Sequence, residues 1–162
     1  MTSFVAARDL VRRAIDARLF PAAAFESGSE SGPAVRESLG TLTFEDPRPA
    51  NDDTVFDLAS LTKPIATTSV VLWLLEQGRL ALETRVGEVL PAWRAPDRTA
   101  VTVADLLEHC SGLPARSAVA PPVPWDDVVE DIATAPLEYR PRERAVYSDL
   151  GFILLGALAA QC

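Results

Sequence analysis

One short stretch decides how this chain folds: residues 56–64, which read FDLASLTKP. Ser60 and Lys63 stand three residues apart in it, and on a helix that spacing brings two Cβ atoms within about 5–6 Å of each other. Pro64 is tolerated in the first turn of a helix but not deep inside one, so the helix begins close to Ser60. The stretch therefore predicts a hydroxyl at a helix N-terminus with an amine in reach.

Lys63 is the only lysine of the chain, against fourteen arginines. A guanidinium keeps its proton in proteins, whereas a lysine amine can lose it when desolvated or placed in positive potential, so this exception points to chemistry. The structural alternative is that Ser60 caps the helix, the commonest role for a serine ahead of an apolar helix. A cation in the first turn is unfavourable for such a cap, because the helix N-terminus is itself positive.

The residues before this stretch predict one helix and one hairpin. Apolar residues at helical spacing indicate an amphipathic helix over residues 4–19. A turn rich in Gly, Ser and Pro at residues 27–33 separates two stretches, 22–26 and 35–44, which indicates a β-hairpin. Because an isolated hairpin is marginal in water, the sheet is expected to be incomplete in this chain.

The residues after it predict helices only. Residues 65–77 are apolar on nearly all sides and end at Gly78, which indicates a buried central helix with a glycine cap. Shorter helices are predicted at residues 86–90, 103–109, 125–133 and 150–160, with a proline-rich loop at residues 120–124 near the mouth of a site. The order of helix, hairpin and then helices predicts an α+β fold.

Composition excludes several classes of protein. Of 162 residues, 48% are apolar and 23% charged, which supports a real core and excludes wholesale disorder. A formal charge of −8 has the wrong sign for binding nucleic acid. One histidine and two cysteines, Cys110 and Cys162, are too few for a zinc site or a disulfide framework. With neither a signal peptide nor a transmembrane run in sight, we expect a soluble, cytoplasmic protein without metal or cofactor.

A second cluster of polar residues, Tyr147-Ser148-Asp149, stands just ahead of the last predicted helix. It has a strong structural interpretation: Ser148 caps the helix, Asp149 favours its first turn, and Tyr147 packs on Phe152 as a hydrophobic staple. Taken alone, the cluster favours structure over function.

Taken together, three motifs occur in the order and spacing of a known family. They are Ser60-x-x-Lys63, HCSGLP at residues 109–114 and YSDLG at residues 147–151. With them the chain resembles the serine β-lactamase and penicillin-binding-protein superfamily, in particular the class C β-lactamase-like serine hydrolases and esterases. The flanking letters FDLASLTK, LLEH and GFILLG agree, and the likeness spans nearly the whole chain.

The resemblance implies a β-lactamase/transpeptidase-like α+β fold: a helical domain plus the first strands of an antiparallel sheet. Residues 1–162 would form a single partial domain of this kind. Its N-terminal helix and first strands would lie in residues 1–59 and its helical part in residues 60–162, with the C-terminal strands and helix missing.

The resemblance also implies acyl transfer on a small ester, amide or lactam. Ser60 would be the nucleophile and Lys63 would take its proton. Tyr147 would be a second acid/base that passes a proton to the leaving group, and Asp149 would bind substrate. The backbone N–H of Ser60 would form half of an oxyanion hole.

For two further residues of the second motif, the resemblance implies structure instead. His109 would belong to a helix end and turn that shapes the core. Cys110 would be a small buried side chain and not a reactive thiol.

The chain departs from the family pattern at two points. The first is Asp149, which replaces the usual Asn. A carboxylate cannot donate a hydrogen bond to a substrate carbonyl, and its negative charge favours the ammonium form of Lys63. That disfavours β-lactam hydrolysis more than ester hydrolysis and shifts the role of base to Tyr147. The family's third motif, Lys-Thr-Gly or His-x-Gly, is absent, and with it the second oxyanion donor.

The missing motif keeps a second hypothesis open, a truncated or non-catalytic remnant that acts only as a binding module. A third, a small helical interaction domain with chance motifs, requires three coincidences.

Overall fold

The computed structural model describes residues 2–116 and 123–162, so most of the predicted loop at residues 120–124 lies outside the described residues. The chain divides into two compact units, Met1–Asp57 and Leu58–Cys162. The first holds a helix and a two-stranded antiparallel sheet, and the second holds helices, which confirms the predicted α+β class. Among the described residues, no helix is long and apolar enough to cross a membrane.

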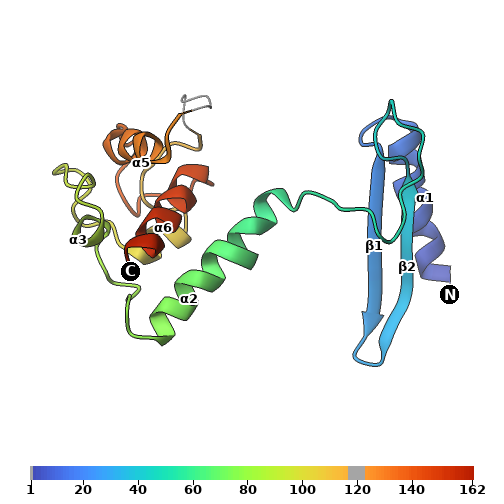
Figure 1. Ribbon diagram of the computed structural model, residues 1–162, viewed down its shortest axis with the longest axis horizontal. Coiled ribbons are helices and arrows are strands. Elements are labelled where there is room, and N and C mark those ends of the chain that lie inside the picture. The colour runs from blue at the N-terminus through green and yellow to red at the C-terminus, as the bar shows by residue number, and fades with distance from the viewer. Residues whose placement is uncertain (1, 117–122) are drawn as a thin grey trace. The chain divides into compact units, whose positions relative to one another are not determined.

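The first unit consists of α1 (Thr2–Asp16) beside the hairpin of β1 (Ala22–Ser29) and β2 (Gly32–Gly40), as Figure 1 shows. The helix ends three residues earlier than predicted, because Arg18 takes a left-handed φ of 57° that breaks the helical geometry. Both strands extend further into the turn than predicted, since β1 continues to Ser29 and β2 begins at Gly32. Gly32 makes this possible, since its φ of 123° is open to glycine and strained for other residues.

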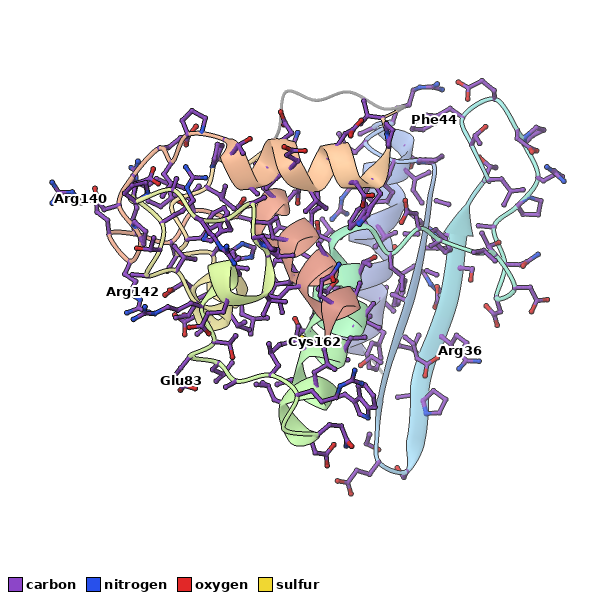
Figure 2. The ribbon with its side chains drawn as sticks, turned by 60° about the vertical axis from the view of Figure 1, so that its left-hand side comes forward. Arg36, Phe44, Glu83, Arg140, Arg142 and Cys162 are labelled. Carbon is purple, nitrogen blue, oxygen red and sulfur yellow. The ribbon has the colours of Figure 1, made fainter. Side chains whose placement is uncertain are left out.

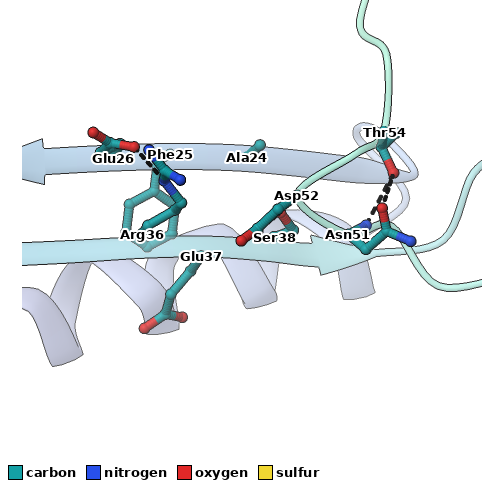
Figure 3. Close-up of a pocket in the computed structure, with 9 residues that line it drawn as sticks. All are labelled: Ala24, Phe25, Glu26, Arg36, Glu37, Ser38, Asn51, Asp52 and Thr54. Atoms are coloured by element: carbon teal, nitrogen blue, oxygen red, sulfur yellow. Dashed lines mark hydrogen bonds and ion pairs between the residues drawn. The ribbon is translucent and has the colours of Figure 1, made fainter. Parts of the chain in front are cut away.

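The two faces of the hairpin carry different side chains, because neighbouring residues of a strand point to opposite sides. Glu37 forms an ion pair with Arg8 of α1. On the other face, Arg36 pairs with Glu26 directly across the strands, and Ser38 donates to Asp52 at 3.0 Å. Figure 3 draws the residues that line a pocket along the hairpin, with Arg36 and Glu26 paired on one face and Glu37 pointing to the other.

The second unit is built around α6 (Asp149–Gln161). The other helices are α2 (Ser69–Glu76), α3 (Val86–Val89), α4 (Val103–Leu107) and α5 (Trp125–Thr134), and each contacts α6. Figures 1 and 2 both show α5 beside α6. The hydrophobic core of this unit forms where α6 packs against these helices. Its buried residues include Leu150, Leu154, Leu155 and Leu158 of α6, Val71 of α2, Leu106 of α4 and Ile132 of α5.

An ion pair between a buried carboxylate and an exposed guanidinium fixes the loop between α5 and α6. Asp105, 3% exposed, accepts from the guanidinium of Arg142 at 2.6 Å and also caps α4 together with Thr102. Arg140 and Arg142 lie at the edge of the unit in Figure 2. Burial alone would raise the pKa of Asp105, but hydrogen bonds from Arg142 and Thr102 hold it below its ordinary value.

The predicted helix over residues 65–77 forms in two parts, η2 (Lys63–Thr68), a π-helical segment, and α2, with Gly78 at a left-handed φ of 66° behind them. The prediction that it is buried on all sides is wrong. Val71 and Leu74 are buried, whereas Ile65, Val70, Leu72 and Trp73 are 46–58% exposed. Within the second unit, α6 packs against η2 and α2, and the apolar pattern does not show which residues such a contact covers.

Candidate active site

Ser60 lies in a single 3₁₀ turn, η1 (Ala59–Leu61), and its side chain is exposed. Ala59, directly before it, has a φ of 44°, in the left-handed region that residues other than glycine rarely adopt. The residues at the cap positions of η1 and η2 are Leu58 and Thr62. Ser60 is therefore not a helix cap, and it stands on a strained turn of the kind found at functional sites.

Lys63 is the first residue of η2, and its ammonium connects two distant parts of the chain. Nζ donates to Oγ of Ser60 at 3.3 Å and to Oδ1 of Asp149 at 2.6 Å. The Lys63 side chain is 14% exposed, whereas that of Asp149 is 42% exposed. Burial alone would lower the pKa of Lys63, but the interactions with Asp149 and Tyr147 raise it above its ordinary value. Lys63 is thus held as an ammonium.

Tyr147 completes this group. Its ring centroid lies 4.8 Å from Nζ of Lys63, and that of Phe152 lies 5.8 Å from the same atom. The interaction with Lys63 is the main cause that lowers the pKa of Tyr147 below its ordinary value, and the interaction with Ser60 is the next largest. The structure therefore brings the four predicted site residues together: Ser60, Lys63, Tyr147 and Asp149.

The segment that carries Tyr147 also has the structural role that its sequence suggested. Ser148 is buried, accepts from the N–H of Gly151 at 3.4 Å as the N-cap of α6, and donates to the carbonyl of Pro114 at 2.6 Å. The backbone N–H of Asp149 donates to the carbonyl of Ala115 at 2.9 Å. The capping interpretation of Ser148 is confirmed, and the same cap places Asp149 opposite Lys63.

The second motif lies directly behind this group. His109 accepts the N–H of Ser148 at Nδ1, at 3.1 Å, and its ring contacts the rings of Tyr147 and Phe152. Sequence reasoning missed these contacts, and the one signal for them was the family motif itself. Cys110 is half-buried, and its thiol donates to the carbonyl of Glu108 at 3.4 Å.

The group places an exposed hydroxyl, a phenol with a lowered pKa and a largely buried ammonium beside one another. An arrangement of this kind could activate a serine hydroxyl, because a nearby base can accept its proton. Within residues 2–116 and 123–162, His, Cys, Asp and Glu side chains form no cluster that could hold a metal ion.

Comparison with known proteins gives matches over most of the chain. A family model described as "Beta-lactamase" matches residues 7–162. A protein of Escherichia coli (strain K12) named "Putative D-alanyl-D-alanine carboxypeptidase" is 33% identical over 137 residues, 76% of this chain and 32% of that protein. This chain spans about a third of the length of the curated relatives it matches.

Two solved structures show the same fold. A penicillin-binding protein homologue from Caulobacter crescentus has a TM-score of 0.79 at 24% identity, covering 98% of this chain and 43% of that one. A class C β-lactamase from Rhodobacter sphaeroides has a TM-score of 0.74 at 23% identity, covering 96% and 43%. These likenesses confirm the predicted β-lactamase/transpeptidase-like fold.

Proposed function

This chain belongs to the β-lactamase family, and from that membership we propose that it carries the nucleophile of a serine hydrolase that cleaves small esters and amides through an acyl-enzyme on Ser60. The observation that carries the proposal is the position of one ammonium. Lys63 contacts the Ser60 hydroxyl, the Asp149 carboxylate and the Tyr147 ring at once. Packing alone gives no reason for these residue types to gather around an exposed serine.

Tyr147 is the base in this proposal. Because Asp149 holds Lys63 as an ammonium, Lys63 cannot take the Ser60 proton, whereas the phenol of Tyr147 has a lowered pKa and interacts with Ser60. Oγ of Ser60 attacks the acyl carbonyl while its proton passes to the Tyr147 phenolate. Tyr147 then protonates the leaving group as the carbon–heteroatom bond breaks. A water molecule, deprotonated in the same way, releases the acid and restores Ser60.

Asp149 favours esters over β-lactams in this site. An ionised carboxylate only accepts hydrogen bonds, so it offers no donor to the carbonyl of a substrate side chain. One of its oxygens is already occupied by Lys63. A small ester without such a side chain carries no carbonyl at this place that requires a donor.

The alternative is a binding module of the same fold that does not turn over. The ion pair of Lys63 with Asp149 favours it at one point, because an ammonium that is held by a carboxylate cannot take the proton of Ser60.

Hydrolysis of a chromogenic ester by the full-length protein separates the two. The proposal predicts steady turnover that Ser60→Ala abolishes. Ser69→Ala is the matched control, because Ser69 is also exposed and lies at the start of α2, directly after η2. Its hydroxyl donates to the backbone carbonyl of Pro64 at 3.2 Å. Turnover that survives Ser60→Ala contradicts the proposal, and ligand binding without turnover supports the alternative.

A further inference from the structure

His109 holds the segment that carries Tyr147 on both sides. Its backbone carbonyl accepts the N–H of Val146 at 3.0 Å, and its Nδ1 accepts the N–H of Ser148 at 3.1 Å. Between these two hydrogen bonds, its ring centroid lies 4.7 Å from that of Tyr147, tilted by 43°. Tyr147 is thus flanked by two backbone groups that are bonded to one and the same residue.

The backbone of His109 is strained to allow this. Its φ of 59° lies in the left-handed region, which costs a residue with a Cβ about 1–2 kcal/mol relative to right-handed backbone. The turn of the helix needs this conformation, because α4 ends at Leu107 and the N–H of Cys110 returns to the carbonyl of Asp105 at 2.7 Å. Glycine or asparagine would adopt it more easily, so helix termination alone does not explain a histidine here.

Only a neutral imidazole with its proton on Nε2 can make the bond to Ser148. A backbone N–H is a donor, so Nδ1 must offer a lone pair, and a protonated ring offers none. The charged and titratable groups that face the ring are Lys63 from η2, Tyr147 from the adjoining loop and Asp149 from α6. Burial lowers the pKa of His109, and the Lys63 ammonium lowers it further, so the neutral ring is favoured.

We propose that His109 is a positioning residue that fixes Tyr147 beside Lys63 and Ser60 by accepting the Ser148 N–H, and that protonation of its ring releases Tyr147. The proposal rests on the hydrolase function proposed above. When Nδ1 carries a proton, two donors face each other across 3.1 Å, and the loop around Tyr147 must move. Misplacement of a reacting group by about 1 Å can cost about 10²-fold in rate.

Two substitutions separate the hydrogen bond from mere packing. In His109→Asn the side-chain oxygen occupies the place of Nδ1, accepts the same N–H, tolerates a left-handed φ and does not titrate. In His109→Gln the acceptor lies one bond further out, where Nε2 stood. The proposal predicts that Asn keeps kcat within about threefold of the parent, whereas Gln lowers it about 10–100-fold with little change in KM.

The pH profile gives a readout that a merely structural role would not move. If only Tyr147 has to lose a proton, log kcat rises with pH at a slope of about one. If His109 must also be neutral, the slope rises to about two at pH values below the pKa of His109. We expect a slope of about two at low pH in the parent and about one in His109→Asn. Equal losses of kcat in Asn and Gln, or a slope unchanged in Asn, would overturn the proposal.

A measurement without substrate keeps this test apart from that of the hydrolase function. The backbone amide signal of Ser148 should move as the parent is acidified through the pKa of His109, and it should stay in place over the same range in His109→Asn. If Ser60 proves unreactive but the amide moves in this way, the hydrolase function fails and the hydrogen bond stands. If the amide does not respond in the parent, the role of His109 fails while the hydrolase function is untouched.

Discussion

The ammonium of Lys63 lies 2.6 Å from a carboxylate oxygen of Asp149, which stands 86 positions further along the chain. The ion pair joins the helix that follows Ser60 to the first turn of α6, and it raises the pKa of Lys63. An ammonium held in this way stabilises a neighbouring phenolate and donates to Ser60, but it cannot act as a base. This pair is the reason why the proposed mechanism gives the role of base to Tyr147 and not to Lys63.

Replacing Asp149 with asparagine tests that division. In Asp149→Asn, Lys63 loses the opposite charge that raises its pKa, and the site gains an amide donor for a substrate carbonyl. One such hydrogen bond is worth about 0.5–1.5 kcal/mol, so the ratio of β-lactam to ester kcat/KM should rise about 2–10-fold. Parallel assays of both substrates on parent and variant measure this ratio. A ratio that stays the same or falls speaks against Asp149 as the residue that disfavours β-lactams.

Removing one oxygen from Tyr147 should abolish the base and leave the fold. In Tyr147→Phe we expect kcat to fall about 10²–10⁴-fold, the usual contribution of general acid–base catalysis. The ring is 53% exposed, so the melting temperature should change little. The pH dependence of kcat gives a second readout. In the parent, kcat rises as pH rises through the lowered pKa of Tyr147, and in Tyr147→Phe this rise disappears. If the rise of kcat with pH is unchanged in Tyr147→Phe, it belongs to the titration of another group.

The strained turn before the nucleophile gives a prediction about stability. Glycine relieves a left-handed backbone, so Ala59→Gly should leave the free energy of unfolding unchanged or raise it by up to about 1 kcal/mol. Ala66→Gly is the matched control, because it removes the same methyl from a helical, exposed position and should cost about 1 kcal/mol. Denaturant unfolding of both variants measures the difference. Equal destabilisation would show that the φ of Ala59 stores no strain.

The fold could be predicted from sequence where local chemistry decides it. Ser148 caps α6 as its position suggested, Gly78 ends α2, and the Ser60 to Lys63 spacing brings the two side chains together. The exposure of Trp73 could not be predicted, because periodicity shows that a helix is apolar but not how many neighbours cover it. The contact between His109 and Ser148 spans 39 residues and depends on a left-handed turn that no propensity scale anticipates.

The buried carboxylate of Asp105 should make the second unit sensitive to acid. Asp105→Ala removes the bond from the Thr102 N–H that completes the capping box of α4, and it removes the partner of Arg142, so it should cost about 2 kcal/mol or more. Because the folded pKa of Asp105 is lowered, its contribution is present above the unfolded pKa of about 3.9 and is lost as pH falls through the folded value. Melting temperatures between neutral and acidic pH, with exposed Glu108→Ala as control, measure it. Equal acid sensitivity in parent and Asp105→Ala would contradict this assignment.

The reactivity of Ser60 is the central claim, and one measurement tests it most directly. The full-length protein is treated with a fluorophosphonate, which reacts with activated serines, and the adduct is located by mass spectrometry of proteolytic peptides. The account predicts a single adduct on the peptide that contains Ser60, formed more slowly in Tyr147→Phe because the base is gone. An unlabelled Ser60, or an adduct on a different residue, would contradict it.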